Sequence, residues 1–185
     1  MTTRVLRTGR PILAALSAAV LGAGCATVPP GGDIRVAQDV DIERFMGDWY
    51  VISSIPTFIE TKAYNAVETY ELNPDGTIDT TFSFRKGGFD GKQKEYNPKG
   101  FVREGTGNAI WGMRFIWPIK ADYRIVYVSD DYSTTIIGRN KRDFVWIMAR
   151  TPELPAQEYI DLVQIVREEG YDTSKLREVP QRWTD

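Results

Sequence analysis

Few side chains in this sequence could do covalent or acid–base chemistry. The chain has no histidine, which removes the commonest general base and the commonest transition-metal ligand. A single cysteine, Cys25, excludes an intramolecular disulfide and a zinc site of the Cys/His type. Carboxylate, lysine, serine and tyrosine chemistry remains open, but these residues form no visible catalytic constellation. We therefore predict no catalytic residues, no bound metal and no cofactor.

The segment that ends at Cys25 predicts one covalent modification. Three arginines among the first ten residues precede an apolar run from 12 to 20, and small residues lead from there to Cys25. This order is typical of a secretory signal, and the apolar run is too short to span a bilayer comfortably. Small residues that end in a lone cysteine resemble a lipoprotein signal, in which the thiol is diacylated. We predict a lipoprotein signal peptide over residues 1–24 and lipidation of Cys25.

The neighbours of Cys25 bear on this prediction. Lipoprotein signals usually carry leucine three residues before the cysteine, whereas Gly22 stands there and Leu21 precedes it. An ordinary signal peptide with an incidental cysteine therefore stays open. Several acyl chains, at ~0.8 kcal/mol per buried CH₂, would make the anchor effectively permanent. Ala26 lacks the acidic side chain that favours retention in the inner membrane of Gram-negative bacteria, so we expect a lipid anchor in the outer membrane, on its periplasmic side.

The rest of the chain is typical of one domain without a nucleic-acid partner. Residues 25–38 contain two prolines and two glycines, which predicts a flexible tether. Residues 39–185 suit a single domain in length. The formal net charge is −2, and charges of both signs are spread along the chain without a basic block.

Alternation of apolar and polar residues predicts an all-β domain. Eight strands are expected, at residues 49–52, 64–72, 77–85, 100–104, 109–117, 123–129, 134–138 and 144–150. The stretch 86–99 holds three glycines, a proline and several charges, so we interpret it as a loop or a ragged edge. Short connections throughout favour an antiparallel up-and-down barrel, which removes exposed strand edges. An eight-stranded barrel has room inside for one small ligand.

One α-helix is expected after the last strand, from Ala156 to Glu169. Its apolar stripe falls at i, i+3, i+4 and i+7, and consists of Tyr159, Leu162, Val163 and Val166. Gly170 is a stop signal. We expect the helix to pack on the outside of the barrel. A helix on a membrane surface is the alternative, and its four acidic residues disfavour it because anionic lipid would repel them.

Strand parity indicates which side chains point into the barrel. Glu68 shares the inward parity of its strand, and an inward carboxylate is costly unless it is paired or protonated. It could pair with an arginine, with Arg114 as the candidate if that residue also faces inward, or bind a ligand's hydroxyl or ammonium group. A position near the rim or a structural pairing is the alternative. The expected cavity wall consists of Tyr64, Glu68, Tyr70, Phe82, Phe84, Trp111, Met113, Phe115 and Tyr127.

Three short motifs resemble the signature of the lipocalin family. Residues 47–50 read Gly-Asp-Trp-Tyr, similar to the opening G-x-W-Y motif. Asp122-Tyr123 resembles the second motif, with Ala121 where threonine is usual, and Arg150 resembles the third. In lipocalins this arginine packs over the opening tryptophan and closes the barrel. The resemblance is greatest to bacterial outer-membrane lipoprotein lipocalins similar to apolipoprotein D, and it marks Gly47, Trp49, Tyr50, Asp122, Tyr123 and Arg150 as fold determinants.

The resemblance implies binding, storage or transport of a fatty acid, a lysophospholipid or a similar lipid in the bacterial envelope. In lipocalins the first loop crosses the open end, so Phe58 and Ile59 are expected to form an apolar lid, or to touch membrane or a partner protein. Two other functions stay open. A barrel filled by bulky side chains would suit a structural or interaction lipoprotein, and an enzyme on this fold would have Glu68 and a tyrosine as its only acid–base candidates.

Overall fold

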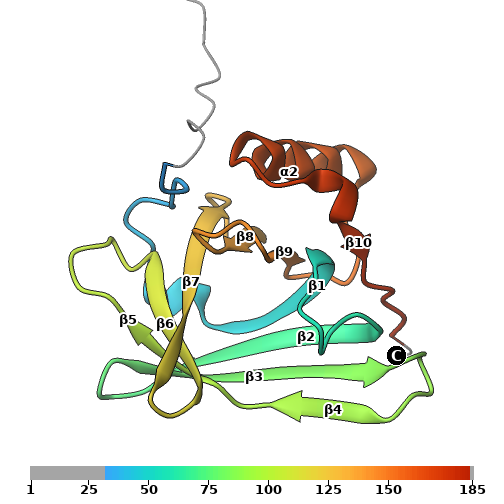
Figure 1. The fold of residues 1–185 in the computed structure, drawn as a ribbon, viewed down its shortest axis with the longest axis horizontal. Coiled ribbons are helices and arrows are strands. Elements are labelled where there is room, and N and C mark those ends of the chain that lie inside the picture. The colour runs from blue at the N-terminus through green and yellow to red at the C-terminus, as the bar shows by residue number, and fades with distance from the viewer. Residues whose placement is uncertain (1–31, 184–185) are drawn as a thin grey trace, which may run out of the picture.

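A closed antiparallel barrel forms the body of the molecule, as the sequence predicted (Figure 1). The computed structural model describes residues 32–183. The strands are β1 (Gly47–Ile55), β2 (Ala63–Leu72), β3 (Thr77–Lys86), β4 (Gln93–Tyr96), β5 (Lys99–Val102), β6 (Ile110–Ile116), β7 (Ile119–Val128), β8 (Thr134–Gly138) and β9 (Val145–Ala149). β1 pairs with β2 through its first half and with β9 through its second, and this double pairing closes the barrel.

β4 and β5 act as one interrupted strand, which makes eight strands in the barrel. β4 pairs Tyr96 with Phe82, and β5 pairs Lys99 with Asp79, in a single continuous register along β3. Pro98 interrupts the strand because it has no N–H to donate, although its carbonyl still accepts the Thr80 N–H at 3.1 Å. The expectation that all of 86–99 is a loop or a ragged edge was therefore wrong for its second half, whose charged side chains lie at the surface.

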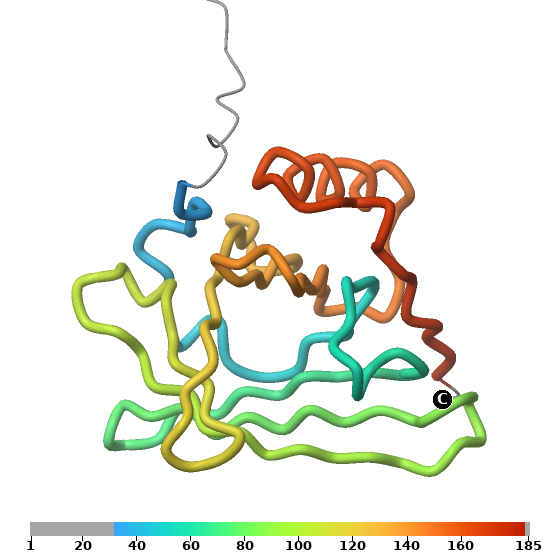
Figure 2. The backbone as a smooth tube through the Cα atoms, in the orientation of Figure 1, coloured from blue at the N-terminus to red at the C-terminus, as the bar shows by residue number. Residues whose placement is uncertain are grey.

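The C-terminal helix α2 (Ala156–Glu168) packs on the outside of the barrel, as expected. Its Leu162 and Val166 are buried against Ile136 and Ile147, whose side chains point outward from β8 and β9. Gly170 follows the helix with a φ of +85°, the left-handed conformation that commonly ends a helix. Figure 2 shows the chain returning from the helix along the barrel, through η1 (Thr173–Lys175) and β10 (Arg177–Glu178), where β10 pairs with β1.

Arg150 and Trp49 close one end of the barrel. The Arg150 guanidinium carbon lies 3.7 Å from the centre of the Trp49 ring. The same guanidinium donates to the carbonyls of Arg44, Phe45 and Met46 at the end of α1 (Ile42–Phe45). Trp49 is fully buried and donates its indole N–H to the Phe45 carbonyl at 2.9 Å. The stacking that the third motif implied is therefore present.

The strand registers contain four β-bulges, and those in β2 and β7 change which side chains face inward. An extra residue lies between Tyr64 and Val67 in β2, where Asn65 has a φ of +46°. The strand turns over at this point, so Ala63 and Ala66 face the interior while Tyr64 packs outside against Phe89. The expected inward position of Tyr64 was wrong for this reason.

The second bulge lies between Ile125 and Tyr127 in β7. Ile125 packs in the interior, whereas Val126 and Tyr127 belong to the cluster beneath α2. Tyr127 therefore lies outside the barrel, contrary to its expected place in the wall. The other two bulges lie between Val51 and Ser53 in β1 and between Met113 and Ile116 in β6.

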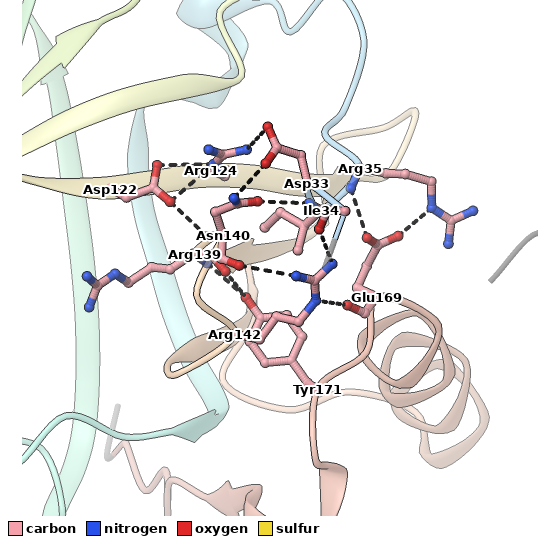
Figure 3. A network of polar contacts seen from close by, with 11 residues as sticks. Asp33, Ile34, Arg35, Asp122, Arg124, Arg139, Asn140, Arg142, Glu169 and Tyr171 are labelled. Atoms are coloured by element: carbon pink, nitrogen blue, oxygen red, sulfur yellow. Dashed lines mark hydrogen bonds and ion pairs between the residues drawn. The ribbon is translucent and has the colours of Figure 1, made fainter. Parts of the chain in front are cut away.

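Part of the expected tether is fixed against the barrel. Ile34 is buried, and the Ala37 N–H donates to the Ile125 carbonyl at 2.9 Å. The backbone N–H of Arg35 donates to Glu169 at 2.8 Å, and its guanidinium pairs with the same carboxylate (Figure 3). Residues 32–38 therefore belong to the folded domain, and the expected signal peptide and Cys25 lie outside the described residues. No helix among residues 32–183 is both long and apolar enough to cross a bilayer.

Candidate ligand-binding cavity

The barrel encloses a cavity of about 110 Å³ whose lining is mainly apolar. Its lining residues come from the β1–β2 loop, from strands β2, β3, β6, β7 and β9, and from the β8–β9 connection. They are Thr57, Ile59, Glu60, Glu68, Phe82, Met113, Phe115, Ala121, Asp122, Tyr123, Arg139, Phe144 and Trp146. Strand parity explains the apolar side of this lining, because Phe82 on β3 and Met113 on β6 point inward at alternate positions.

A layer of aromatic rings separates the cavity from the closed end. Tyr70, Trp111 and Tyr123 lie edge to face or stacked with ring centres 5.1 to 6.3 Å apart, and Phe45 packs beneath them. The hydroxyls of Tyr70 and Tyr123 lie 2.5 Å apart. Tyr70 and Trp111 were expected in the cavity wall, but they fill the barrel below the cavity and do not line it.

Glu68 lies at the inner end of the cavity, above this aromatic layer. It is paired across the sheet with Trp49 and Phe82 and has the inward orientation that strand parity predicted. Burial raises the pKa of Glu68 to about 8, and the hydrogen bond from Tyr70 only partly offsets this effect. The carboxyl is therefore protonated for most of the time at neutral pH. No lysine or arginine among residues 32–183 forms an ion pair with it, so Arg114 is not its partner.

Glu60 brings a second carboxyl to the same cavity, and sequence parity could not find it because it lies in a loop. The indole N–H of Trp146 donates to Glu60 at 2.7 Å, and the Thr57 hydroxyl donates to its other oxygen at 2.6 Å. Burial raises the pKa of Glu60 despite these two hydrogen bonds. Its negative charge also contributes to the raised pKa of Glu68.

Asp122 and Arg139 are the other charged groups of the lining, and each has a partner within the protein. Asp122 binds the Arg124 guanidinium at 3.1 Å and accepts the Asn140 backbone N–H at 2.8 Å. The side chain of Arg139 points away from this network (Figure 3) and pairs with Asp143 at 3.3 Å. Its Nε is buried without a hydrogen-bond partner in the described structure. Asp122 and Tyr123, expected to be fold determinants, therefore also border the cavity.

Exposed apolar side chains flank the cavity. Phe115 lines it and is 56% exposed, and the adjoining β6–β7 turn exposes Ile116, Trp117 and Ile119 by more than two thirds. In the β1–β2 loop Ile59 faces the cavity, whereas Phe58 is 88% exposed to solvent. The expected lid is thus divided between a residue that faces the cavity and a residue that faces outward.

The structure brings together four of the nine residues expected in the wall, namely Glu68, Phe82, Met113 and Phe115. Phe84 packs in the interior beside Phe82 but borders no part of the cavity. The polar residues of the lining that the sequence did not predict, Thr57, Glu60 and Arg139, lie in loops. Phe58 and Ile59, which were expected to form a lid, are the predicted residues that lie closest in sequence to Glu60.

A closed barrel with an outside helix, an arginine stacked at one end and an internal cavity defines the class of small β-barrel binding proteins. The chain belongs to the lipocalin family, because residues 40–181 match the lipocalin-like domain. It is 36% identical to temperature-induced lipocalin-1 of Arabidopsis thaliana over 163 residues, which cover 80% of this chain and 83% of the relative. It is 26% identical to the outer membrane lipoprotein Blc of Escherichia coli K12, covering 92% and 96% of the two chains.

Other similarities agree with this assignment. Apolipoprotein D of Mus musculus is 26% identical over 166 residues, with 79% of each chain covered. Among solved structures, insecticyanin from the tobacco hornworm Manduca sexta superposes with a TM-score of 0.65 at 16% identity, over 83% of this chain and 86% of that one. At that identity the likeness shows the fold alone. Members of the family are generally binding and transport proteins for small hydrophobic ligands.

Proposed function

We propose that this protein binds an amphiphilic small molecule, a lipid or a compound of similar apolar character, in the bacterial cell envelope. The observation that carries the proposal is the internal cavity, which has apolar walls and lies next to exposed apolar side chains. Its volume of about 110 Å³ is below the usual range for ligand pockets. It is close to that of an engineered apolar cavity of about 150 Å³ that holds benzene. The cavity therefore holds a head group or a few carbons, and the rest of a longer ligand lies along Phe115 and its exposed neighbours.

We further propose an acyl anchor on Cys25 and a location at the outer membrane. The relatives named outer membrane lipoproteins support this location. Gly32 is already held by Arg142, which donates to its carbonyl at 2.9 Å. Residues 26–31 are then all that separate the anchor from the fixed segment, and six residues span at most about 20 Å. The barrel would therefore stay close to the membrane that supplies its ligand.

A filled barrel with a structural role is the second candidate, and a specific observation favours it. Trp49, Tyr70 and Trp111 are fully buried and occupy the lower half of the barrel. Only the upper half is left for a ligand.

A cavity-filling substitution distinguishes the two functions. Ala121 lines the cavity and is partly exposed to it, so Ala121→Trp would fill much of the space without touching the aromatic layer. Binding of a neutral probe, a fluorescently labelled fatty alcohol, should fall by about tenfold or more, while the melting temperature stays near that of the parent. The matched control is Thr81→Trp on the outer face of β3. Equal probe binding by all three proteins, or none by any of them, contradicts a ligand-binding cavity.

A further inference from the structure

The charges around the cavity select the head group of the ligand. We propose that the cavity receives the ammonium group of an organic amine, with Glu68 and Glu60 as its counter-ions and the apolar body of the ligand directed toward Phe115. This inference rests on the proposed function, since it specifies the chemistry of the molecule that the cavity binds. It differs from a fatty acid, which is one of the ligands that the family resemblance implied.

The cavity lining carries more acidic than basic side chains. The four charged groups of the lining are Glu60, Glu68, Asp122 and Arg139. Asp122 is neutralised by Arg124 and Arg139 by Asp143, both within the protein. The two glutamates are left without a cationic partner among residues 32–183, and no other cation faces the cavity. A ligand that brings one positive charge therefore complements the site, whereas a carboxylate adds a third acidic group.

The position of Glu68 determines which end of a ligand is favoured to enter first. Glu68 lies at the inner end of the cavity, with Tyr70 and Tyr123 beneath it and Phe82 and Met113 beside it. A fatty acid that entered with its methyl end first would place hydrocarbon against this carboxyl and leave Tyr70 as its hydrogen-bond partner, without a counter-ion. An ammonium group that entered first would donate hydrogen bonds to Glu68 there, and charge-assisted hydrogen bonds are the strong ones.

Glu60 and Arg139 border the same cavity and add polar groups that can orient the ligand. Glu60 is held by Trp146 and Thr57, so its carboxylate stays at the cavity without rearrangement of the loop. A primary ammonium has three N–H donors, so the number of its donors is sufficient for two carboxyl groups. The unpartnered Nε of Arg139 can donate to a hydroxyl or carbonyl oxygen on the same ligand. Arg139 is also the one group of the lining that would favour an anionic head instead.

The test compares three ligands that differ only in their head groups. Decylamine, decanoate and decanol, each below its aggregation limit, are titrated calorimetrically into the protein at pH 7. Decylamine, which is protonated at this pH, should bind about tenfold or more tightly than decanol, and decanoate more weakly than decanol. Tighter binding of decanoate than of decylamine would overturn the inference and assign head-group selection to Arg139.

Substitution of one carboxyl provides the matched variant. Glu68→Gln should bring the affinity for decylamine to within about twofold of the affinity for decanol in the same variant. Glu71→Gln, at an exposed position three residues further along β2, should retain the full preference for the amine. Titration in buffers of different ionisation enthalpy adds a readout that a structural role would not move. The parent should release most of one proton when decylamine binds at pH 7, because the ammonium ionises Glu68, and Glu68→Gln should release far less.

The outcomes separate this inference from the proposed function. Binding of all three ligands with equal affinity refutes the ammonium site and leaves a cavity for apolar chains. Failure of all three to bind refutes the proposed function itself. An amine preference that survives in Glu68→Gln with unchanged proton release refutes the role of Glu68, even if the variant proves less stable than its parent.

Discussion

The Arg150 guanidinium lies 3.7 Å over the Trp49 ring and donates to five backbone carbonyls, those of Arg44, Phe45, Met46, Asp48 and Tyr132. One side chain thus binds the end of α1, the start of β1 and the β7–β8 turn. Burial lowers the pKa of Arg150, but the guanidinium remains charged at any physiological pH. Its position at the closed end makes it a determinant of stability that is remote from the cavity.

Removal of this side chain should therefore lower the stability of the fold and leave ligand affinity unchanged. Arg150→Ala leaves partly buried carbonyls without their donor, and we expect a loss of about 2–4 kcal/mol in the free energy of unfolding, measured by urea titration. Arg150→Lys should recover only part of this loss, because an ammonium has three donors and cannot stack as a planar group. Ligand affinity at a temperature where the variant is folded should stay unchanged, and a large loss of affinity would contradict the separation of the two ends.

The raised pKa of Glu68 makes stability depend on pH. The folded protein holds a proton on Glu68 up to about pH 8, whereas the unfolded chain loses it near the ordinary glutamate pKa of 4.5. Stability should therefore fall as the pH rises between these two values. Glu68→Gln removes this dependence, so the variant and the parent should have similar melting temperatures at pH 5. At pH 9 the variant should be more stable, by on the order of 2–4 kcal/mol.

Glu60 acts in the same direction, so the difference between the parent and Glu68→Gln is the informative quantity. Parallel pH profiles for the two proteins would show that Glu68 titrates normally, and would remove the reason to consider it buried and unpaired.

The hydrogen bond between Trp146 and Glu60 connects β9 to the first loop. Trp146→Phe keeps most of the aromatic volume and removes the indole donor, leaving Glu60 with Thr57 alone. We expect a higher pKa for Glu60, since one of the two interactions that lower it is lost. Decylamine affinity at pH 7 should fall by about three- to tenfold. Unchanged amine affinity would indicate that Glu60 does not contact the head group.

The exposed β6–β7 turn provides a test of ligand entry. Trp117→Ser and Ile116→Ser remove apolar surface that is already exposed, so the melting temperature should change little. Transfer of a fluorescently labelled fatty alcohol from phosphatidylglycerol-containing vesicles to the protein should slow by several-fold, because the apolar contact beside the cavity is lost. Ile160→Ser on α2 is the matched control, since Ile160 is 58% exposed but belongs to the helix on the outside of the barrel. Equal slowing by the control would contradict entry beside Phe115.

The parts of the fold that depend on local pattern could be predicted from the sequence. Asn73 to Gly76 form the expected turn between β2 and β3, where the Gly76 N–H donates to the Asn73 carbonyl at 2.9 Å. The apolar stripe of α2 and the inward orientation of Glu68 likewise follow from periods of 3.6 and two residues. These features require only neighbours along the chain.

The features that escaped prediction depend on contacts between distant segments. The bulge at Asn65 reverses the parity of Tyr64, and nothing in the alternation of β2 marks where the extra residue is inserted. The bulge between Ile125 and Tyr127 does the same for Tyr127, whose aromatic ring suits either face. Glu60 and Arg139 reach the cavity from loops, where no periodicity applies. The fixed position of residues 32–38 depends on Glu169, which is more than a hundred residues away.

Native mass spectrometry of the form that begins after Cys25, purified from a bacterial host and followed by lipid extraction under denaturing conditions, would show whether the cavity binds a ligand. The described residues contain the complete barrel, so this form retains the cavity. We expect a co-purified small molecule of defined mass that is released on denaturation and displaced by added decylamine. A protein that is free of ligand, and that takes up neither an amine nor a fatty acid nor an alcohol, would contradict it and leave the filled barrel as the better description.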